Sequence, residues 1–92
     1  MPQIIVENIS SQKIKVVEVT LPSNKVVFDS IEQGSIHRIY YSLSQRDGVY
    51  KYLVVFEDGN EITGKCGYVT ANELGKSHRF TVRGNSVVTC NG

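Results

Sequence analysis

The sequence predicts an all-β protein, folded as an antiparallel Greek-key sandwich of seven or eight strands. Three observations carry this prediction. Short runs of β-branched and aromatic residues recur along the chain, Gly, Pro, Asn, Asp and Ser separate them, and the one stretch with tolerable helical propensity, residues 71–74, is cut off by Gly75. Many short strands with short connections are typical of sandwiches and barrels, so a small closed barrel is the alternative.

Eight runs have the strand pattern, at residues 3–9, 13–21, 25–31, 35–44, 49–57, 61–70, 77–83 and 86–89. In the second run the apolar positions change parity near Val16 and Val17, which predicts a β-bulge there because side chains in a strand alternate with a period of two. In the third run we expect Val26 and Phe28 to face the core. In the seventh run His78 shares the parity of Phe80.

The most informative stretch is residues 35–70, which predicts three consecutive antiparallel strands joined by tight turns. The first turn, at residues 45–48, would place Ser44 opposite Val49, and therefore Tyr41 opposite Tyr52 and His37 opposite Phe56. One face of this hairpin is then far more apolar than the other and becomes the core face. The outer face carries Ile36, Arg38, Tyr40, Lys51, Leu53 and Val55.

The second turn is predicted to be a three-residue loop at residues 58–60, since a two-residue turn would place Ile62 on the outer face. The loop puts Glu61 opposite Glu57 and Cys66 opposite Tyr52. Glycines inside the last of these strands indicate a bulge or close backbone packing against tyrosines. This register predicts a group of tyrosines on the core side, formed by Tyr41, Tyr50, Tyr52 and Tyr68.

Length and composition predict one domain, residues 1–92, with 40% hydrophobic residues and a formal net charge of +1. So balanced a charge gives no electrostatic preference for nucleic acid or anionic lipid, and nucleic acid is therefore disfavoured as a partner. No run approaches the length of a membrane span, and the N-terminus lacks the pattern of a signal peptide. The protein is either cytoplasmic or the mature part of an exported protein.

Cys66 and Cys90 are the two cysteines of the chain. A disulfide between them would suit an exported domain, and two buried thiols would suit a cytosolic one. Two cysteines are too few for an all-cysteine zinc site. The sequence leaves both alternatives open.

No motif for catalysis or for a cofactor is present. A metal site would need His37 and His78 to converge with Cys66 or a carboxylate, and no metal-ligand spacing supports this. A Cys–His nucleophile would need an exposed cysteine, whereas the predicted register buries Cys66 against Tyr52. We therefore expect no enzyme activity, no metal and no cofactor.

The motif N-I-S at residues 8–10, I-x-x-G at residues 31–34 and the two hairpins resemble small immunoglobulin-like or transthyretin-like sandwiches of bacterial origin. The resemblance covers most of the chain. It lacks the tryptophan and the cysteine spacing of immunoglobulin domains. It implies a fold and no functional residues.

The predicted outer face of residues 35–57 is the candidate functional surface. Its apolar members would form a patch that a monomeric protein rarely leaves uncovered. We therefore expect a non-catalytic module that binds another protein, an inhibitor-type domain, or a dimer. The alternative is a carbohydrate- or single-stranded nucleic-acid-binding domain that uses Arg38, Tyr40 and Lys51.

Overall fold

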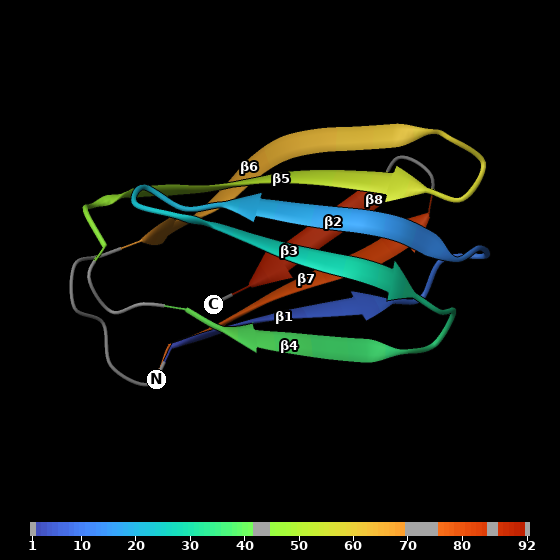
Figure 1. The fold of residues 1–92 in the computed structure, drawn as a ribbon, viewed down its shortest axis with the longest axis horizontal. Helices are drawn as coiled ribbons and strands as arrows, with labels where there is room; N and C mark the ends of the chain where they lie inside the picture. Colours follow the sequence, from blue (N-terminus) through green and yellow to red (C-terminus); the bar gives the residue numbers. More distant parts are fainter. Residues whose placement is uncertain (1, 42–44, 70–75, 85–86, 92) are drawn as a thin grey trace.

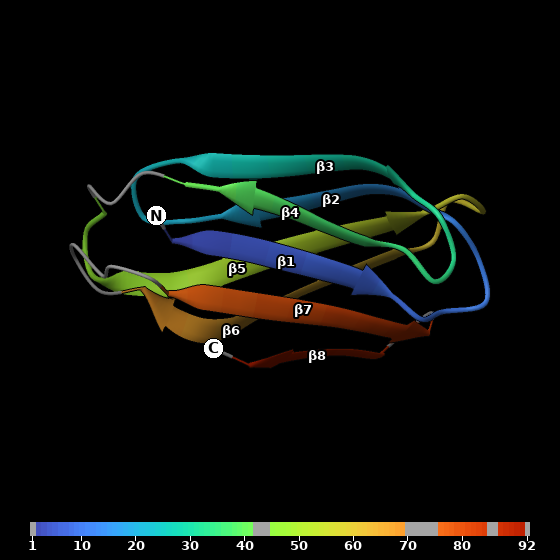
Figure 2. The ribbon, with the colours of Figure 1, turned by 90° about the horizontal axis from the view of Figure 1, so that it is seen from below.

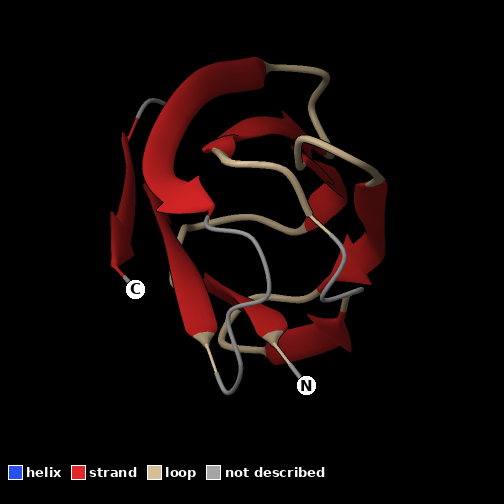
Figure 3. Cartoon of the chain, turned by 90° about the vertical axis from the view of Figure 1, so that its left-hand side faces the viewer, coloured by secondary structure: helices blue, strands red, loops and turns tan. Residues whose placement is uncertain are grey.

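Two four-stranded β-sheets pack face to face in the computed structural model, which describes residues 2–41, 45–69, 76–84 and 87–91 (Figure 1). The predicted all-β sandwich is confirmed, and the strands form two sheets in place of the alternative closed barrel. Seen along the long axis, the strands surround a common interior (Figure 3). The strands are β1 (Gln3–Asn8), β2 (Ile14–Thr20), β3 (Lys25–Ile31), β4 (Ile36–Tyr40), β5 (Gly48–Phe56), β6 (Glu61–Val69), β7 (Ser77–Gly84) and β8 (Val87–Asn91).

The strand order is β4-β1-β7-β8 in one sheet, called sheet A here, and β3-β2-β5-β6 in the other, sheet B. The chain crosses between the sheets at the β1–β2, β3–β4, β4–β5 and β6–β7 connections. β1 and β7 are parallel neighbours, whereas the other neighbouring strands are antiparallel. The edge strands β3 and β4 lie together on one side of the sandwich and β6 and β8 on the other (Figure 2).

The predicted hairpin between residues 35–44 and 49–57 is wrong. β4 pairs with β1, with Tyr40 opposite Gln3, while β5 pairs with β2 and β6 in the other sheet. The predicted pairs of His37 with Phe56 and of Tyr41 with Tyr52 therefore do not form; the pair of Ser44 with Val49 lies outside the described residues. The chain reverses direction after β4 as the turn signal predicts, but it crosses to the other sheet as it does so.

The predicted irregularity in the second strand is confirmed, slightly earlier than expected. Ile14 lies opposite Phe56 and Val16 opposite Val55, so Lys15 is the extra residue of a bulge. The bulge brings both Ile14 and Val17 to the inner face, where each is at most 1% exposed.

The third strand also has the predicted orientation. Val26 is 5% exposed and Phe28 is 3% exposed, and both face the core. After Phe28 the alternation of inward and outward side chains is broken at Ser30, which has a positive φ of 52°. Ile31, and not Ser30, therefore points into the core.

The β5–β6 hairpin has the predicted facing but a register shifted by two residues. Ile62 lies opposite Val54 and Glu61 opposite Val55, so the predicted Glu57–Glu61 pair is absent. A shift of two residues keeps each side chain on its face, because the alternation has a period of two. Ile62 and Cys66 therefore still pack against the core.

A second irregularity places Tyr68 outside the core, contrary to prediction. The register of β6 changes between the Lys51–Lys65 and Val49–Tyr68 pairs, and Gly67 there has a φ of +85°. The extra residue reverses the facing of the side chains after it. Tyr68 is therefore 77% exposed, and Val69, 3% exposed, takes the inner place.

The other three tyrosines of the predicted group do contribute to the core. Tyr41 is 4% exposed and Tyr50 is fully buried, and their hydroxyl oxygens lie 2.7 Å apart in a hydrogen bond. Tyr52 packs against the core and lies across Gly64, where an added Cβ would collide with the phenol ring. Close backbone packing explains this glycine, as the sequence suggested.

A buried asparagine organises the turn after β1, within the N-I-S motif. The Asn8 side chain is fully buried, donates hydrogen bonds to the carbonyls of Gln12 (2.9 Å) and Ile31 (3.1 Å), and accepts them from the N–H and hydroxyl of Ser10 (3.0 and 2.6 Å). It thereby ties the β1–β2 turn to the end of β3. A buried amide with its bonds satisfied in this way is a structural device.

Candidate functional site

The predicted partner-binding strip is divided between the two sheets. Its first three residues, Ile36, Arg38 and Tyr40, lie on β4 at the edge of sheet A, and the other three, Lys51, Leu53 and Val55, lie on β5 inside sheet B. The prediction that they form one continuous surface is wrong because β4 and β5 do not pair. Each half is therefore a separate candidate.

The β4 half presents both side chains and backbone to the exterior. Ile36 is 48% exposed and Tyr40 is 56% exposed, with the exposed Arg38 between them. The N–H of Tyr41 donates to the carbonyl of Pro2 on the β1 side (3.0 Å). Because hydrogen-bonding groups alternate along an antiparallel strand, the backbone groups of Ile36, Arg38 and Tyr40 point away from β1, toward the free edge.

The β5 half faces outward from the middle of sheet B and is better covered. Leu53 and Val55 are only half-exposed, since they lie between β2 and β6. Lys51 lies directly opposite Thr20 on one side and Lys65 on the other, and Thr20 lies opposite Lys25. A row of three lysines therefore crosses this face of the sheet, although like charges directly opposite one another are unfavourable.

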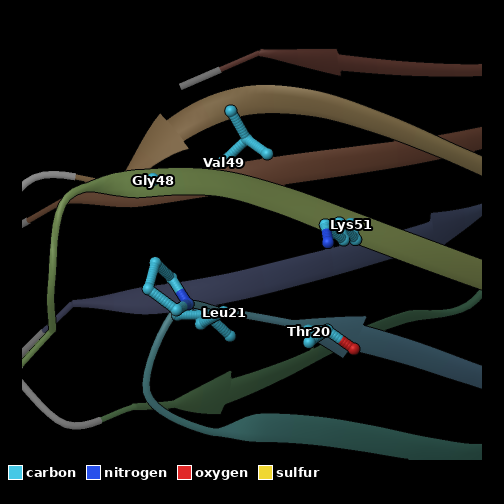
Figure 4. A pocket seen from close by; sticks show the side chains of 6 residues that line it. Thr20, Leu21, Gly48, Val49 and Lys51 are labelled. Atoms are coloured by element: carbon cyan, nitrogen blue, oxygen red, sulfur yellow. The ribbon is translucent and has the colours of Figure 1, made fainter.

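A hollow of about 420 Å³ lies beside this row, where β2 ends and β5 begins (Figure 4). Lys51 is the one lining residue that carries a charge, and the lining includes no acid and no second base. The hollow could seat part of a ligand that Lys51 attracts, but its lining offers no pair of groups for general acid–base chemistry. The lining residues are Thr20, Leu21, Pro22, Gly48, Val49 and Lys51.

A third group of residues, which sequence reasoning did not bring together, is the cysteine–histidine cluster of Cys66, His78 and Cys90. These residues lie on β6, β7 and β8, and the two sulfur atoms and one ring nitrogen of His78 all lie within 4.8 Å of one another. The structure joins Cys66 and Cys90 in a disulfide with a Cα–Cα distance of 6.5 Å. This bond links the edge strand of sheet B to the edge strand of sheet A.

His78 is deeply buried in this cluster. It is 2% exposed, stacks on the ring of Tyr50 with 4.1 Å between centroids, and meets Phe80 edge to face at 4.9 Å. Burial, together with the positive charge of Lys76, lowers the pKa of the His78 imidazole from 6.5 to about 4. The ring is therefore neutral at pH 7.

Both ring nitrogens of His78 lack a hydrogen-bond partner among the described residues. The backbone of Cys66 lies close enough to act against the lowering of the pKa, but its contact with the ring does not have the geometry of a hydrogen bond. Buried polar atoms without a partner are rare in native proteins, and each one costs about 1–3 kcal/mol. This histidine is accordingly the least satisfied polar side chain of the described interior.

The bulge in β6 makes room for the His78 ring. Gly67 has a φ of +85°, and a Cβ there would collide with Cε1 of His78 and lie 2.7 Å from its Nε2. The absence of a side chain thus lets the ring lie against the β6 backbone next to Cys66. Gly67 lies against Tyr50, as expected for a strand glycine that packs on tyrosines, and also against His78.

The sequence predicts a metal site only if His37 and His78 converge, and the structure groups His78 with both cysteines instead. His37 lies half-buried on β4 and is not part of the cluster. The sequence pattern did indicate that Cys66 faces the core and that His78 shares the parity of Phe80, but it did not predict that His78 is buried. What the sequence lacked was the arrangement of the strands: β8 pairs with β7 in sheet A, and the packing of the two sheets brings β6 of sheet B against β8.

Comparison with known proteins gives a fold and no family. No protein-family model matches this chain, and no curated protein matches it. A protein from Eubacterium rectale, whose structure was determined by NMR, is similar to it with a TM-score of 0.68 and 15% sequence identity, over 98% of this chain and 85% of that one. At this identity the likeness shows the sandwich fold alone. No helix among the described residues is long and apolar enough to span a membrane.

Proposed function

We propose that this protein is a non-catalytic binding module that pairs the free edge of β4 with an extended segment of another protein. The observation that carries the proposal is the combination, on one edge strand, of two large exposed apolar side chains with outward-pointing backbone groups at Ile36, Arg38 and Tyr40. Backbone hydrogen bonds would supply affinity, and the alternate side chains would supply specificity.

β4 lacks the irregularities that distort two of the other edge strands, β3 and β6. β3 carries a kink at Ser30 with a φ of 52°, and β6 carries the bulge at Gly67. β4 keeps an unbroken register with β1 over all five of its residues. Its protection is limited to its short length and to Arg38, so it is more open to pairing than β3 or β6.

The side chains of β4 define the kind of partner segment that fits. Ile36 and Tyr40 flank Arg38 on the outer face, so an added strand would lay every second side chain beside them. A segment with apolar residues at two alternate positions and an acidic residue between them matches this order. Such a strand would also cover the exposed apolar surface.

The proposal is tested by capture of partners from lysate of the native organism, with variants matched for exposure. Ile36→Glu changes β4, and Val27→Glu is its control on the edge strand β3, since Val27 is 44% exposed against 48% for Ile36. Tyr40→Ser is compared with Tyr68→Ser in the same way. We expect a specific partner to be retained by the control variants and lost by the β4 variants.

Light scattering of the purified protein separates a foreign partner from a second copy of the chain. A dimer that Ile36→Glu dissociates, and Val27→Glu does not, would assign the β4 edge to self-association. A partner that binds wild type and both β4 variants equally would refute the assignment of binding to this edge.

The alternative candidate is a single-stranded nucleic acid on the outer face of sheet B, favoured by the lysine row. Lys51 and Lys65 face each other directly, and the exposed Tyr68 lies one pair further along. Lysines for phosphates and an aromatic ring for base stacking are the groups such a ligand needs. Lys25 contributes less, because it pairs with Glu18 at 3.0 Å.

This alternative replaces the combination of Arg38, Tyr40 and Lys51, which the structure separates. Fluorescence anisotropy with a labelled oligonucleotide tests it: binding should weaken with salt and with Lys51→Ala and Lys65→Ala together. Salt-insensitive binding, or binding that survives the double substitution, would reject it.

An immunoglobulin-like or transthyretin-like assignment and a bacterial source belong to the same proposal. They are supported by the sequence pattern and by the fold likeness to the Eubacterium rectale protein.

A further inference from the structure

The cysteine–histidine cluster has a donor set that the proposed binding function does not use. Two sulfur atoms and a buried imidazole from three neighbouring strands converge within 4.8 Å. The imidazole has no hydrogen-bond partner at either nitrogen among the described residues. Convergence and an unsatisfied buried donor are two independent observations, and both point to a ligand between these side chains.

We propose that, once the disulfide is reduced, Cys66, His78 and Cys90 bind one zinc ion through two thiolates and a neutral imidazole, with a water molecule in the fourth position. A dithiol reductant supplies two electrons and two protons, which break the S–S bond into two thiols, and is itself oxidised to a disulfide. Zinc then replaces the two thiol protons, which are released to solvent.

The chemistry of the donors selects this class of ion. Thiolate and imidazole are the preferred ligands of zinc, and three protein ligands plus water is an established coordination for it. Two thiolates cancel the charge of Zn²⁺, so the bound cluster would be neutral, which suits a mostly buried position.

The positions of the three residues require only a small adjustment. Tetrahedral zinc places S and N donor atoms roughly 3.5–3.8 Å apart, as follows from Zn–S and Zn–N bonds of about 2.3 and 2.0 Å. The present separations are at most 4.8 Å, so the imidazole must approach and the bonded sulfurs must part. Cys66 and Cys90 lie on edge strands of different sheets, where no shared hydrogen-bond ladder opposes this movement.

The two cysteines are partly exposed, which allows solvent to reach the site. Cys66 and Cys90 are each of intermediate burial, whereas His78 is 2% exposed. A water molecule can therefore occupy the fourth position from outside, while the imidazole is held from inside by Tyr50 and Phe80. Coordination would also give one of the unsatisfied nitrogens a partner.

The experiment measures zinc affinity of the full chain after reduction with a dithiol and removal of the dithiol under argon. Competition with a chromophoric chelator gives the stoichiometry and the Kd. We expect one zinc per chain for the reduced wild type and none for the oxidised form. His78→Gln should weaken binding by about 100-fold or more, as should Cys66→Ser or Cys90→Ser, while His37→Gln, the matched histidine control, should bind like wild type.

Two results would overturn the proposal. One is a reduced wild type that binds zinc no better than the oxidised form, and the other is His78→Gln binding as tightly as wild type. Circular dichroism verifies that each variant is folded. If His78→Gln does not fold, Co²⁺ is added to the reduced wild type as a spectroscopic probe of the site. Thiolate charge-transfer bands, tetrahedral d–d bands and an NMR shift of the His78 ring would support the site. Their absence would reject it.

Discussion

Acidification should destabilise this protein through His78, in the oxidised and metal-free state. The folded chain keeps the imidazole neutral down to a pKa of about 4, whereas in the unfolded chain it has its ordinary value of 6.5. Between these two values the unfolded state binds a proton that the folded state does not, so the free energy of unfolding decreases as the pH falls. The contribution is fully present above pH 6.5 and is lost by about pH 4.

The size of the effect is set by the separation of the two pKa values. Each unit of separation corresponds to about 1.4 kcal/mol, so the interval from 6.5 to about 4 amounts to about 3 kcal/mol. That is a large part of the stability expected for a chain of 92 residues. The effect is measured as a difference between variants, so that the contributions of all other groups cancel.

Urea denaturation between pH 7.5 and 3.5, in the presence of a chelator, measures it. His78→Gln removes the titrating group, and the wild-type stability should fall by about 3 kcal/mol more than that of this variant over the range. His37→Gln should behave like the wild type. A pH dependence that is the same for wild type and His78→Gln would show that the buried imidazole does not resist protonation, and the reasoning would be wrong.

Two further substitutions test the interior. Gly67→Ala should destabilise the fold by about 1–3 kcal/mol more than Gly34→Ala. Both glycines have a positive φ (85° and 76°), but an added Cβ at Gly67 also collides with His78, while an added Cβ at Gly34 meets no atom. Equal losses of stability in denaturation experiments would contradict the close packing of Gly67 against His78. Tyr50→Phe should lower the stability by about 1–2 kcal/mol, because it removes the hydroxyl that bonds Tyr41. Changing both Tyr41 and Tyr50 to Phe should recover part of that loss. Strictly additive losses in a double-mutant cycle would show that the two hydroxyls are not coupled.

The facing of side chains could be predicted from the sequence far better than the pairing of strands. Tyr41 and Tyr50 are buried as expected, although Tyr41 follows β4 of sheet A and Tyr50 lies on β5 of sheet B. Alternation with a period of two reports which side of a strand is apolar, and it carries no information about the neighbouring strand. The error at β4 arose from assuming that consecutive strands pair, which the crossing connection contradicts.

The cysteine–histidine cluster shows the same limit at the scale of a site. His78 follows Cys66 by 12 residues and Cys90 follows His78 by another 12, and no short motif joins them. Their proximity depends on the packing of β6 in sheet B against β8 in sheet A, which the alternation of apolar residues does not specify. The glycines of this strand did indicate a bulge, but the outward position of Tyr68 was not predicted. The position of the extra residue decides which side chains change from the inner to the outer face of the sheet.

The parallel pairing of β1 with β7 has a consequence for biosynthesis. β1, with the sequence QIIVEN, is synthesised early, but its neighbour β7 begins only at Ser77. Until then a strongly hydrophobic strand has one side without a partner, which is the state in which chains aggregate. Folding must wait for most of the chain to leave the ribosome, and fragments that end before Ser77 should accumulate as insoluble material.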